Sequence, residues 1–312
     1  VAKINARRAP VFYSKNYQDD MFTPNSSLKM FSQLQGPKKM LLNKGWHAAT
    51  ELPGALLGID NYQYEQVHRW FDYWLKGKDN GIMNEPQVDM EIENKSGRER
   101  LASWPAPNVA TQTLNIAPRG KIRWDWNCFC AKGDVGYLQS AVSSDAAVDS
   151  INNSLDTVAN SGIPVLGNLL EGFGAPPLAW MPAVLRDHGV VYNGKALSSE
   201  LKLRGMPKVQ MHVKPTGPRA QVVAYLYDVD ALGWGKLITH GVRSLHWATP
   251  GQTISFPVEM DMAAYNVPAG HHLTLVVDTR DARYAKPSDG WFGVDLMFSA
   301  EQKSTLSIPY IN

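Results

Sequence analysis

The sequence feature that most constrains the fold is a change of pattern between residues 86 and 96. Beyond it, short runs rich in Val, Tyr and Leu recur, separated by turns of Gly, Pro and Asp. Many runs alternate apolar and polar residues, which is the period of a half-buried strand. This spacing predicts an all-β sandwich. The predicted strands are Lys208–Lys214, Gln221–Asp228, Lys236–Trp247, Thr253–Glu259, His272–Asp278 and Thr305–Pro309.

The first 95 residues follow a different pattern. Ala9–Ser14 and Lys39–Asn43 are short apolar runs suited to buried strands, and Pro24–Ser27 predicts a helix start with a Ser cap. A longer helix ending near Gly77 is predicted to bury one aromatic and aliphatic face, formed by Val67, Trp70, Phe71, Trp74 and Leu75. Alternating strands and helices predict a parallel α/β sheet.

We therefore predict two domains, residues 1–95 and 96–312, with a linker around Trp104–Asn108. Residues 140–188 do not follow the strand pattern, since polar residues come first and then Pro, Gly, Trp and Leu. We expect this stretch to be a long excursion from the sandwich with some helix. Trp180 and Met181 within it are interpreted as packing residues in preference to pocket lining.

Charge and hydropathy exclude several classes of protein. The 312 residues carry a net charge of +2 and no Lys/Arg cluster, so we expect no nucleic-acid partner. The apolar runs are too short for the roughly 20 residues that span a bilayer. The chain begins with Val1 without a signal-peptide pattern and has two cysteines, which fits a processed extracytoplasmic protein slightly better than a truncated cytoplasmic one.

The strongest chemical signal is a carboxylate and an imidazole after the two predicted strands of the first part. Asp20 precedes Pro24 by four residues, and His47 follows the next strand. At the carboxyl ends of neighbouring parallel strands, the Asp can accept the Nδ1 proton of the His and leave Nε2 as a base. The spacing to Pro24 favours Asp20 over its neighbour Asp19, but both stay candidates. The competing interpretation is a turn or cap Asp beside a structural His.

The nucleophile that such a pair would serve is missing from the sequence. There is no Gly-x-Ser-x-Gly motif, and Ser161 and Ser288 lack a strand–turn–helix context. If the protein is a serine hydrolase, its serine precedes Val1.

The other polar residues have simpler interpretations. His271 and His272 point to opposite faces of a predicted strand, so we predict no metal site there. Asp278 and Asp281 are predicted to form ion pairs in preference to binding a cation.

Three segments resemble the carboxyl-terminal half of the X-prolyl dipeptidyl-peptidase-like hydrolases, which include cocaine esterase, α-amino acid ester hydrolases and glutaryl-cephalosporin acylases. Asn16–Phe22 resembles the aromatic–Asp–x–Phe loop of that family. Val67–Gly81 is similar to its Trp-Phe-Asp-x-Trp-Leu-Lys-Gly helix ending and is the most specific match. Val267–Leu273 resembles a Pro-Gly-His-Arg turn, with His272 where the family often has Arg.

The resemblance implies the carboxyl-terminal portion of an α/β-hydrolase domain, ending near residue 95, followed by a jelly-roll sandwich. Asp20 and His47 match the acid and base of the family, while the serine, the oxyanion-hole tyrosine and a helical cap would lie upstream of Val1. It implies acyl-enzyme hydrolysis of an ester or an amide without a metal or organic cofactor. The expected partners are an amino-terminal half that carries the serine and a small ester or peptide substrate.

Two hypotheses of another class stay open beside the hydrolase. The sandwich could be a non-catalytic ligand-binding module, or it could form a homo-oligomer through its surfaces. Neither of these functions would need Asp20 or His47.

Overall fold

The computed structural model of the chain describes residues 1–19, 21–48, 51–120, 123–125, 130–132, 134–143, 146–162, 167, 170, 175–284 and 290–311. These residues form two compact units. The first unit consists of Val1–Val109, Met262–Asn266 and the described residues within 165–175. The second unit contains the remaining described residues.

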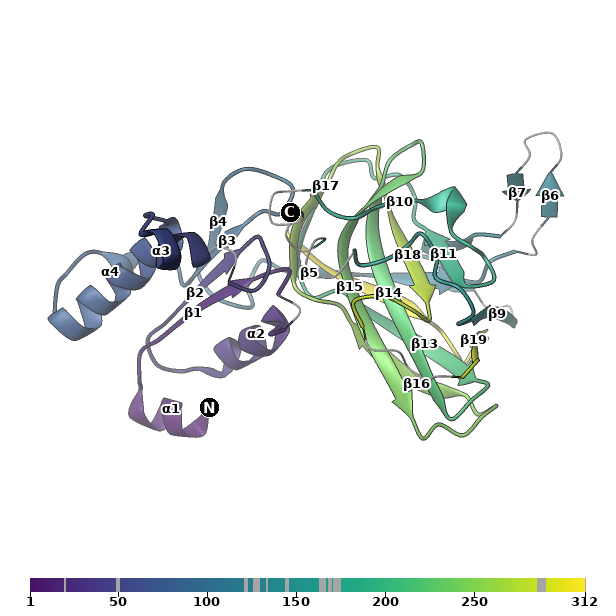
Figure 1. Cartoon of the computed structure of the whole chain (residues 1–312), viewed down its shortest axis with the longest axis horizontal. Helices are drawn as coiled ribbons and strands as arrows, with labels where there is room; N and C mark the ends of the chain where they lie inside the picture. The colour runs from purple at the N-terminus through teal and green to yellow at the C-terminus, as the bar shows by residue number, and fades with distance from the viewer. Residues whose placement is uncertain are drawn as a thin grey trace. The chain divides into compact units, whose positions relative to one another are not determined.

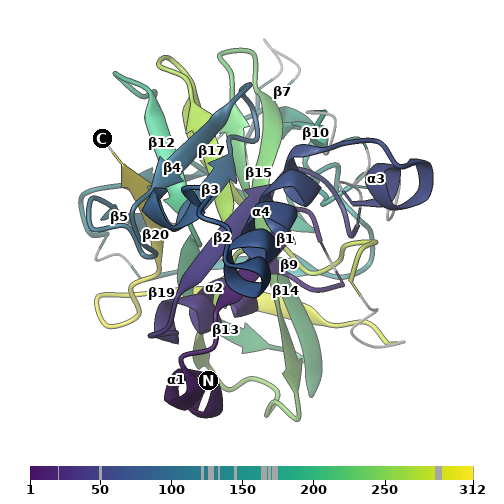
Figure 2. The same ribbon diagram turned by 90° about the vertical axis from the view of Figure 1, so that its left-hand side faces the viewer.

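The first unit is built on a four-stranded sheet, β1 (Val11–Asn16), β2 (Lys38–Asn43), β3 (Val88–Glu91) and β4 (Arg98–Leu101), in that spatial order. The first three strands are parallel and β4 is antiparallel to β3. Its helices are α1 (Ala2–Arg7), α2 (Pro24–Gln33), α3 (Leu52–Leu57), α4 (Tyr62–Lys76) and the 3-10 turn η1 (Ile82–Asn84). Figures 1 and 2 show these elements from two sides.

Helices α2 and α4 cover opposite faces of this sheet. Phe12 and Tyr13 are neighbours on β1, so their side chains point to opposite faces. The Phe12 ring lies 5.8 Å from Trp70 of α4, and the Tyr13 ring lies 6.4 Å from Phe31 of α2. The parallel α/β pattern expected for this part of the chain is therefore present.

Two details of these helices differ from expectation. The predicted Ser cap of α2 is wrong, because the helix begins at Pro24 and Thr23 occupies the cap position without a side-chain hydrogen bond. Trp70 is buried as predicted, but Phe71 and Leu75 of α4 are 49% and 76% exposed. The predicted burial of Phe71 and Leu75 is therefore wrong for this unit. Gly77 ends this helix in the left-handed conformation, as expected.

The second unit is almost entirely antiparallel sheet, as predicted for a sandwich. Its main path runs β10-β15-β14-β18-β11-β8-β5-β20-β13-β19-β9, and β16 pairs with β13. All the strands predicted from alternation are confirmed, as β13 (Lys208–Pro215), β14 (Arg219–Val229), β15 (Trp234–His246), β16 (Ile254–Glu259), β18 (His272–Asp278) and β20 (Thr305–Ile311). The remaining strands of this unit are β5 (Ala110–Ala117), β6 (Arg123–Asp125), β7 (Cys130–Lys132), β8 (Gly136–Gln139), β9 (Ala147–Asn152), β10 (Leu178–Trp180), β11 (Gly189–Asn193), β12 (Leu201–Gly205) and β19 (Gly293–Phe298). Strand β17 (Ala263–Val267) lies mostly in the segment Met262–Asn266, which belongs to the first unit.

Two described parts of the excursion, residues 146–162 and 176–188, pack onto this sheet. Strands β9 and β10 pair with β19 and β15. A cluster of buried side chains joins one face of β14 to the excursion, and its members include Val223, Tyr225, Tyr227, Ala159, Ala179, Met181 and Val184. Met181 is thus a core residue. Among the described residues of the excursion, η2 (Met181–Ala183) is a 3-10 turn, and Gly167 and Leu170 are helical, so the stretch contains some helix as expected.

A buried polar network fastens the same excursion to the sheet. Ser161 donates from its backbone N–H and its hydroxyl to Asp281, over 2.7 and 2.6 Å, and the Tyr225 hydroxyl donates to the same carboxylate over 2.8 Å. Asp278 accepts a hydrogen bond from Thr157 over 3.3 Å. Burial, and then the charge of Asp281, hold the pKa of Asp278 well above its ordinary value. These acids therefore accept from protein donors, and in the part of the chain that the structure describes the ion pair of this run, residues 278–281, is made by Arg280, whose Nε lies 3.0 Å from Asp156.

His240 gives this unit a pH-dependent stability. Burial and the Arg283 guanidinium lower its pKa from 6.5 to about 3, although Asp281 opposes them. Nε2 accepts from Arg283 over 2.9 Å and Nδ1 lies 2.5 Å from the Tyr284 hydroxyl, so the folded imidazole is neutral. Between pH 6.5 and about 3 the unfolded chain gains a proton here that the folded chain does not.

We therefore expect the free energy of unfolding to fall as the pH is lowered through that window. The slope should be smaller for His240→Gln, and denaturant titrations at a series of pH values would measure it. His246→Gln, at an exposed position of β15, is the control. Parallel curves for the wild type and His240→Gln would contradict the expectation.

No helix among the described residues is long and apolar enough to cross a membrane.

Candidate functional site

The candidate site lies at the carboxyl edge of the sheet in the first unit, where β1 and β2 end side by side. Beyond their last paired residues, Asn16 and Asn43, the two loops continue to exchange hydrogen bonds. Tyr17 N–H donates to the Asn43 carbonyl over 2.9 Å, and Gln18 N–H donates to the Gly45 carbonyl over 3.2 Å. The parallel pairing thus carries the residues after both strands to one place.

Asp19 and His47 meet there. Nδ1 of His47 lies 3.0 Å from Oδ2 of Asp19. The Asp19 side chain is only 6% exposed, whereas that of His47 is 38% exposed. A carboxylate can only accept, so Nδ1 carries the proton and Nε2 is the basic nitrogen of the neutral ring. Nε2 has no hydrogen-bond partner among the described residues.

The second oxygen of Asp19 is held by the backbone. Oδ1 accepts from the N–H groups of Met21 and Phe22, over 3.1 and 2.9 Å, in a turn that the Asp itself organises. With both oxygens engaged, the carboxylate is fixed in position and aimed at His47. This is the geometry of a carboxylate that orients an imidazole.

The sequence prediction chose Asp20 as the acid, and Asp20 lies outside the described residues. The carboxylate in contact with His47 is that of Asp19, the alternative left open by the sequence. The side chain of Asp19 organises the turn before Pro24, and the assignment of the acid stays a prediction. The signal available in the sequence was the position of Asp19, two residues before Met21 and three before Phe22, because an Asp side chain in a turn commonly accepts from backbone N–H groups that follow it.

The loop that carries His47 has a constrained backbone. Gly45 and Ala48 have φ of +108° and +57°, and the Asn16 side chain donates to the Trp46 carbonyl over 2.8 Å. The Phe22 ring lies 5.4 Å from the imidazole and leaves the opposite side uncovered by any ring that the structure describes. Asn16, Gly45 and Phe22 were not predicted as site residues.

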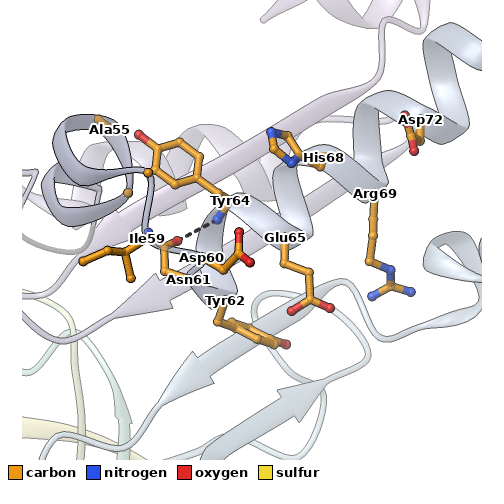
Figure 3. Close-up of a pocket in the computed structure, with 12 residues that line it drawn as sticks. Ala55, Ile59, Asp60, Asn61, Tyr62, Tyr64, Glu65, His68, Arg69 and Asp72 are labelled. Carbon is orange, nitrogen blue, oxygen red and sulfur yellow. Dashed lines mark hydrogen bonds between the residues drawn. The ribbon is translucent and has the colours of Figure 1, made fainter.

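Residues that follow His47 in the sequence form an open groove of about 840 Å³. The groove lies between α3 and the first turns of α4 (Figure 3). Gly54 allows α3 to approach closely, since a Cβ there would come within 2.6 Å of Asn61 and Tyr64. Arg69 in the groove is already paired with Glu85. Neither Asp19 nor His47 belongs to its lining, so this groove is separate from the His–Asp pair.

The second unit carries a His–Asp pair and a groove of its own. His271 Nδ1 lies 2.7 Å from the buried carboxylate of Asp228, and the described residues contain no group of three potential metal ligands. Burial, and then the neighbouring His271, lower the pKa of His272. A groove of about 420 Å³ beside β9 and β19 is lined by polar residues and by the exposed Trp291.

Comparisons with known proteins agree on one family. A family model described as the X-Pro dipeptidyl-peptidase C-terminal non-catalytic domain matches residues 80–293. Candidate Xaa-Pro dipeptidyl-peptidases of Bacillus anthracis and Bacillus cereus are each 27% identical over 264 residues, which is 81% of this chain.

Solved structures extend the likeness over nearly the whole chain. A CocE/NonD family hydrolase from Staphylococcus aureus matches with a TM-score of 0.67 and 13% identity over 97% of this chain and 55% of its own. An α-amino acid ester hydrolase matches with a TM-score of 0.65 and 16% identity over 99% of this chain and 57% of its own. These likenesses show a common fold.

The chain is shorter than the proteins it resembles. It spans only 38% and 39% of the length of the two Bacillus relatives.

Proposed function

The chain belongs to the family of the X-Pro dipeptidyl-peptidase C-terminal non-catalytic domain, as its motifs predicted. From that premise we propose that the residues before the matched region supply the acid and the base of a serine hydrolase. Asp19 is the acid and His47 the base in this proposal. The observation that carries it is the pair itself, with Nδ1 engaged by a buried carboxylate and Nε2 open. Residues 1–95 are the corresponding portion of the α/β-hydrolase domain.

The proposed reaction is acyl transfer to a serine and then to water. As the serine oxygen attacks an ester or amide carbonyl, its proton passes to Nε2 of His47. Asp19 stabilises the imidazolium that forms, and His47 then gives the proton to the leaving group. Water, activated by the same nitrogen, hydrolyses the acyl-enzyme. None of these steps uses a metal or an organic cofactor.

The serine is proposed to come from an amino-terminal half, either a separate chain or a preceding segment. Strand β1 is an edge strand that pairs only with β2 among the described residues. Large apolar side chains are exposed on the same unit, including Met21, Phe22, Leu56, Leu57, Phe71 and Leu75. A unit with an unpaired sheet edge and exposed apolar side chains is suited to receive further strands and helices.

A fluorophosphonate probe tests this proposal, because it labels an activated serine whatever the natural substrate is. The native preparation would be labelled, separated under denaturing conditions and analysed by the intact mass of every band. We expect the label on a serine of an upstream fragment, or of a longer chain that contains this one. His47→Ala should abolish the labelling.

The proposal is contradicted if the upstream half is present and folded but the probe labels no serine in it. Ligand binding by the sandwich would then become the leading function. The groove at Trp291 is the feature of the second unit that favours that second candidate.

A further inference from the structure

We propose that Gln18 and Glu93 are positioning residues for His47, and that they connect its loop to the distant segment Met262–Asn266. The inference rests on the proposed function, since His47 must act as a base for its position to affect catalysis. Neither residue touches the imidazole. Their role follows from a continuous chain of hydrogen bonds within the first unit.

Gln18 joins the loop of the acid to the loop of the base. It directly precedes Asp19, and its Oε1 accepts from the N–H of Gly45 over 2.8 Å, two residues before His47. Its own N–H donates to the Gly45 carbonyl over 3.2 Å. Both polar backbone groups of Gly45 are therefore held by one residue.

Glu93 in turn fixes the amide of Gln18. Nε2 of Gln18 donates to Oε2 of Glu93 over 2.8 Å. Gly45 offers a donor and Glu93 an acceptor, so only one orientation of the amide satisfies both neighbours. Glu93 therefore reinforces the orientation in which the oxygen of Gln18 faces Gly45.

Glu93 is itself anchored by the segment between β16 and β18. Its Oε1 accepts from Ala264 N–H over 2.9 Å, and its own N–H donates to the Ala264 carbonyl over 2.8 Å. The next residue repeats this arrangement, since the Asn94 side chain donates to the Asn266 carbonyl over 2.7 Å and accepts from Asn266 N–H over 3.0 Å. Ala264 is fully buried.

The segment also reaches the other side of the acid loop. Met262 N–H donates over 2.7 Å to the side chain of Asn25, which is buried in the first turn of α2. Residues 262–266 thus hold the chain both after Asp19 and, through Glu93 and Gln18, beside His47. The two loops of the catalytic pair share one support.

The hydrogen bonds from Gly45 through Gln18 and Glu93 to Ala264 allow a test in which the side chains of residues 18 and 93 are exchanged. In Glu93→Gln, the new side-chain amide keeps its oxygen toward the N–H of Ala264. Its NH2 group then faces the NH2 group of Gln18, so the hydrogen bond between the side chains of residues 18 and 93 is lost. In Gln18→Glu, two carboxylates face each other. In the double variant, the side chain of residue 18 accepts from Gly45 and from the amide of residue 93, whose oxygen accepts from Ala264, so the three side-chain hydrogen bonds that link Gly45, residue 18, residue 93 and Ala264 are restored.

The test measures the rate of fluorophosphonate labelling across a range of pH, in the protein that contains the serine-bearing half. We expect each single variant to lower the plateau rate about 10-fold. The double variant should return to within about threefold of the wild type. The two single variants change the local charge in opposite directions, so a purely electrostatic influence would move their rates and pH midpoints in opposite directions, whereas loss of position lowers both plateaus.

Single variants that label at the wild-type rate, or a double variant slower than either of them, would overturn the inference. Thermal unfolding of all variants is measured in parallel, and a loss of plateau rate without a matching loss of stability identifies positioning. His47→Ala separates the two levels of the proposal. If it labels normally, the proposed function fails, and if it is inactive while both single variants are normal, only the inference fails.

Discussion

Replacing His47 with Ala is expected to lower kcat/KM for ester or amide hydrolysis on the order of 10⁵-fold in the protein that contains the serine-bearing half. Nε2 of His47 is the basic nitrogen of the pair and has no hydrogen-bond partner among the described residues. No other histidine that the structure describes forms a hydrogen bond with Asp19. Without it, the serine has no acceptor for its proton and the leaving group has no donor. Steady-state kinetics with a chromogenic ester would measure the loss.

The matched control is His68→Ala. His68 is an exposed histidine of α4 in the same unit and lines the groove of Figure 3, away from the pair. We expect its kcat/KM to stay within about threefold of the wild type. An equal loss in both variants would mean that destabilisation of the unit, and not removal of the base, explains the effect.

Asp19→Asn is expected to lower kcat about 10⁴-fold with little change in folding. An asparagine of the same shape has one accepting oxygen, whereas Asp19 accepts from His47 at one oxygen and from Met21 and Phe22 at the other. The NH2 group of the asparagine must then face either Nδ1–H of His47 or the backbone N–H groups of Met21 and Phe22, from which it cannot accept a hydrogen bond. The imidazole loses its orientation and its compensating charge.

Asp20→Asn distinguishes the two candidate acids. Since Nδ1 of His47 already has Asp19 as its partner, we expect this variant to lose less than about tenfold in kcat. The opposite ranking, with Asp20→Asn the more damaging substitution, would return the role to the residue favoured by the spacing to Pro24. Circular dichroism of both variants would check that the unit stays folded.

Most of the sandwich could be predicted from local pattern alone. Strands such as β13 alternate between buried and partly buried residues, so the period of the strand is visible in the sequence. Strand β14 is buried almost throughout, because the excursion covers its second face, and its Val and Tyr content still marked it as a strand. The excursion was harder to predict, because its residues pack by shape and not by a repeating period.

The contact between His47 and a carboxylate at the sheet edge could be anticipated from the sequence, with Asp19 and Asp20 both left as candidates. Two short strands followed by a carboxylate and an imidazole indicated a meeting at the sheet edge, and the resemblance narrowed the chemistry. The choice between Asp19 and Asp20 depends on which side chain organises the turn, and that depends on backbone geometry that no spacing reveals. The support from Glu93 and Ala264 joins positions 171 residues apart, and nothing in the local sequence marks such a contact.

The unit that carries the pair is discontinuous along the chain, and this has a consequence for how the protein folds. Its segment Met262–Asn266 leaves the ribosome long after β1 to β4, with most of the sandwich made in between. Closing so long a loop costs conformational entropy, and contacts across it form late. The loops of Asp19 and His47 can therefore reach their final geometry only after most of the second unit has been synthesised. During synthesis, a nascent chain that already contains both residues would still lack an ordered site.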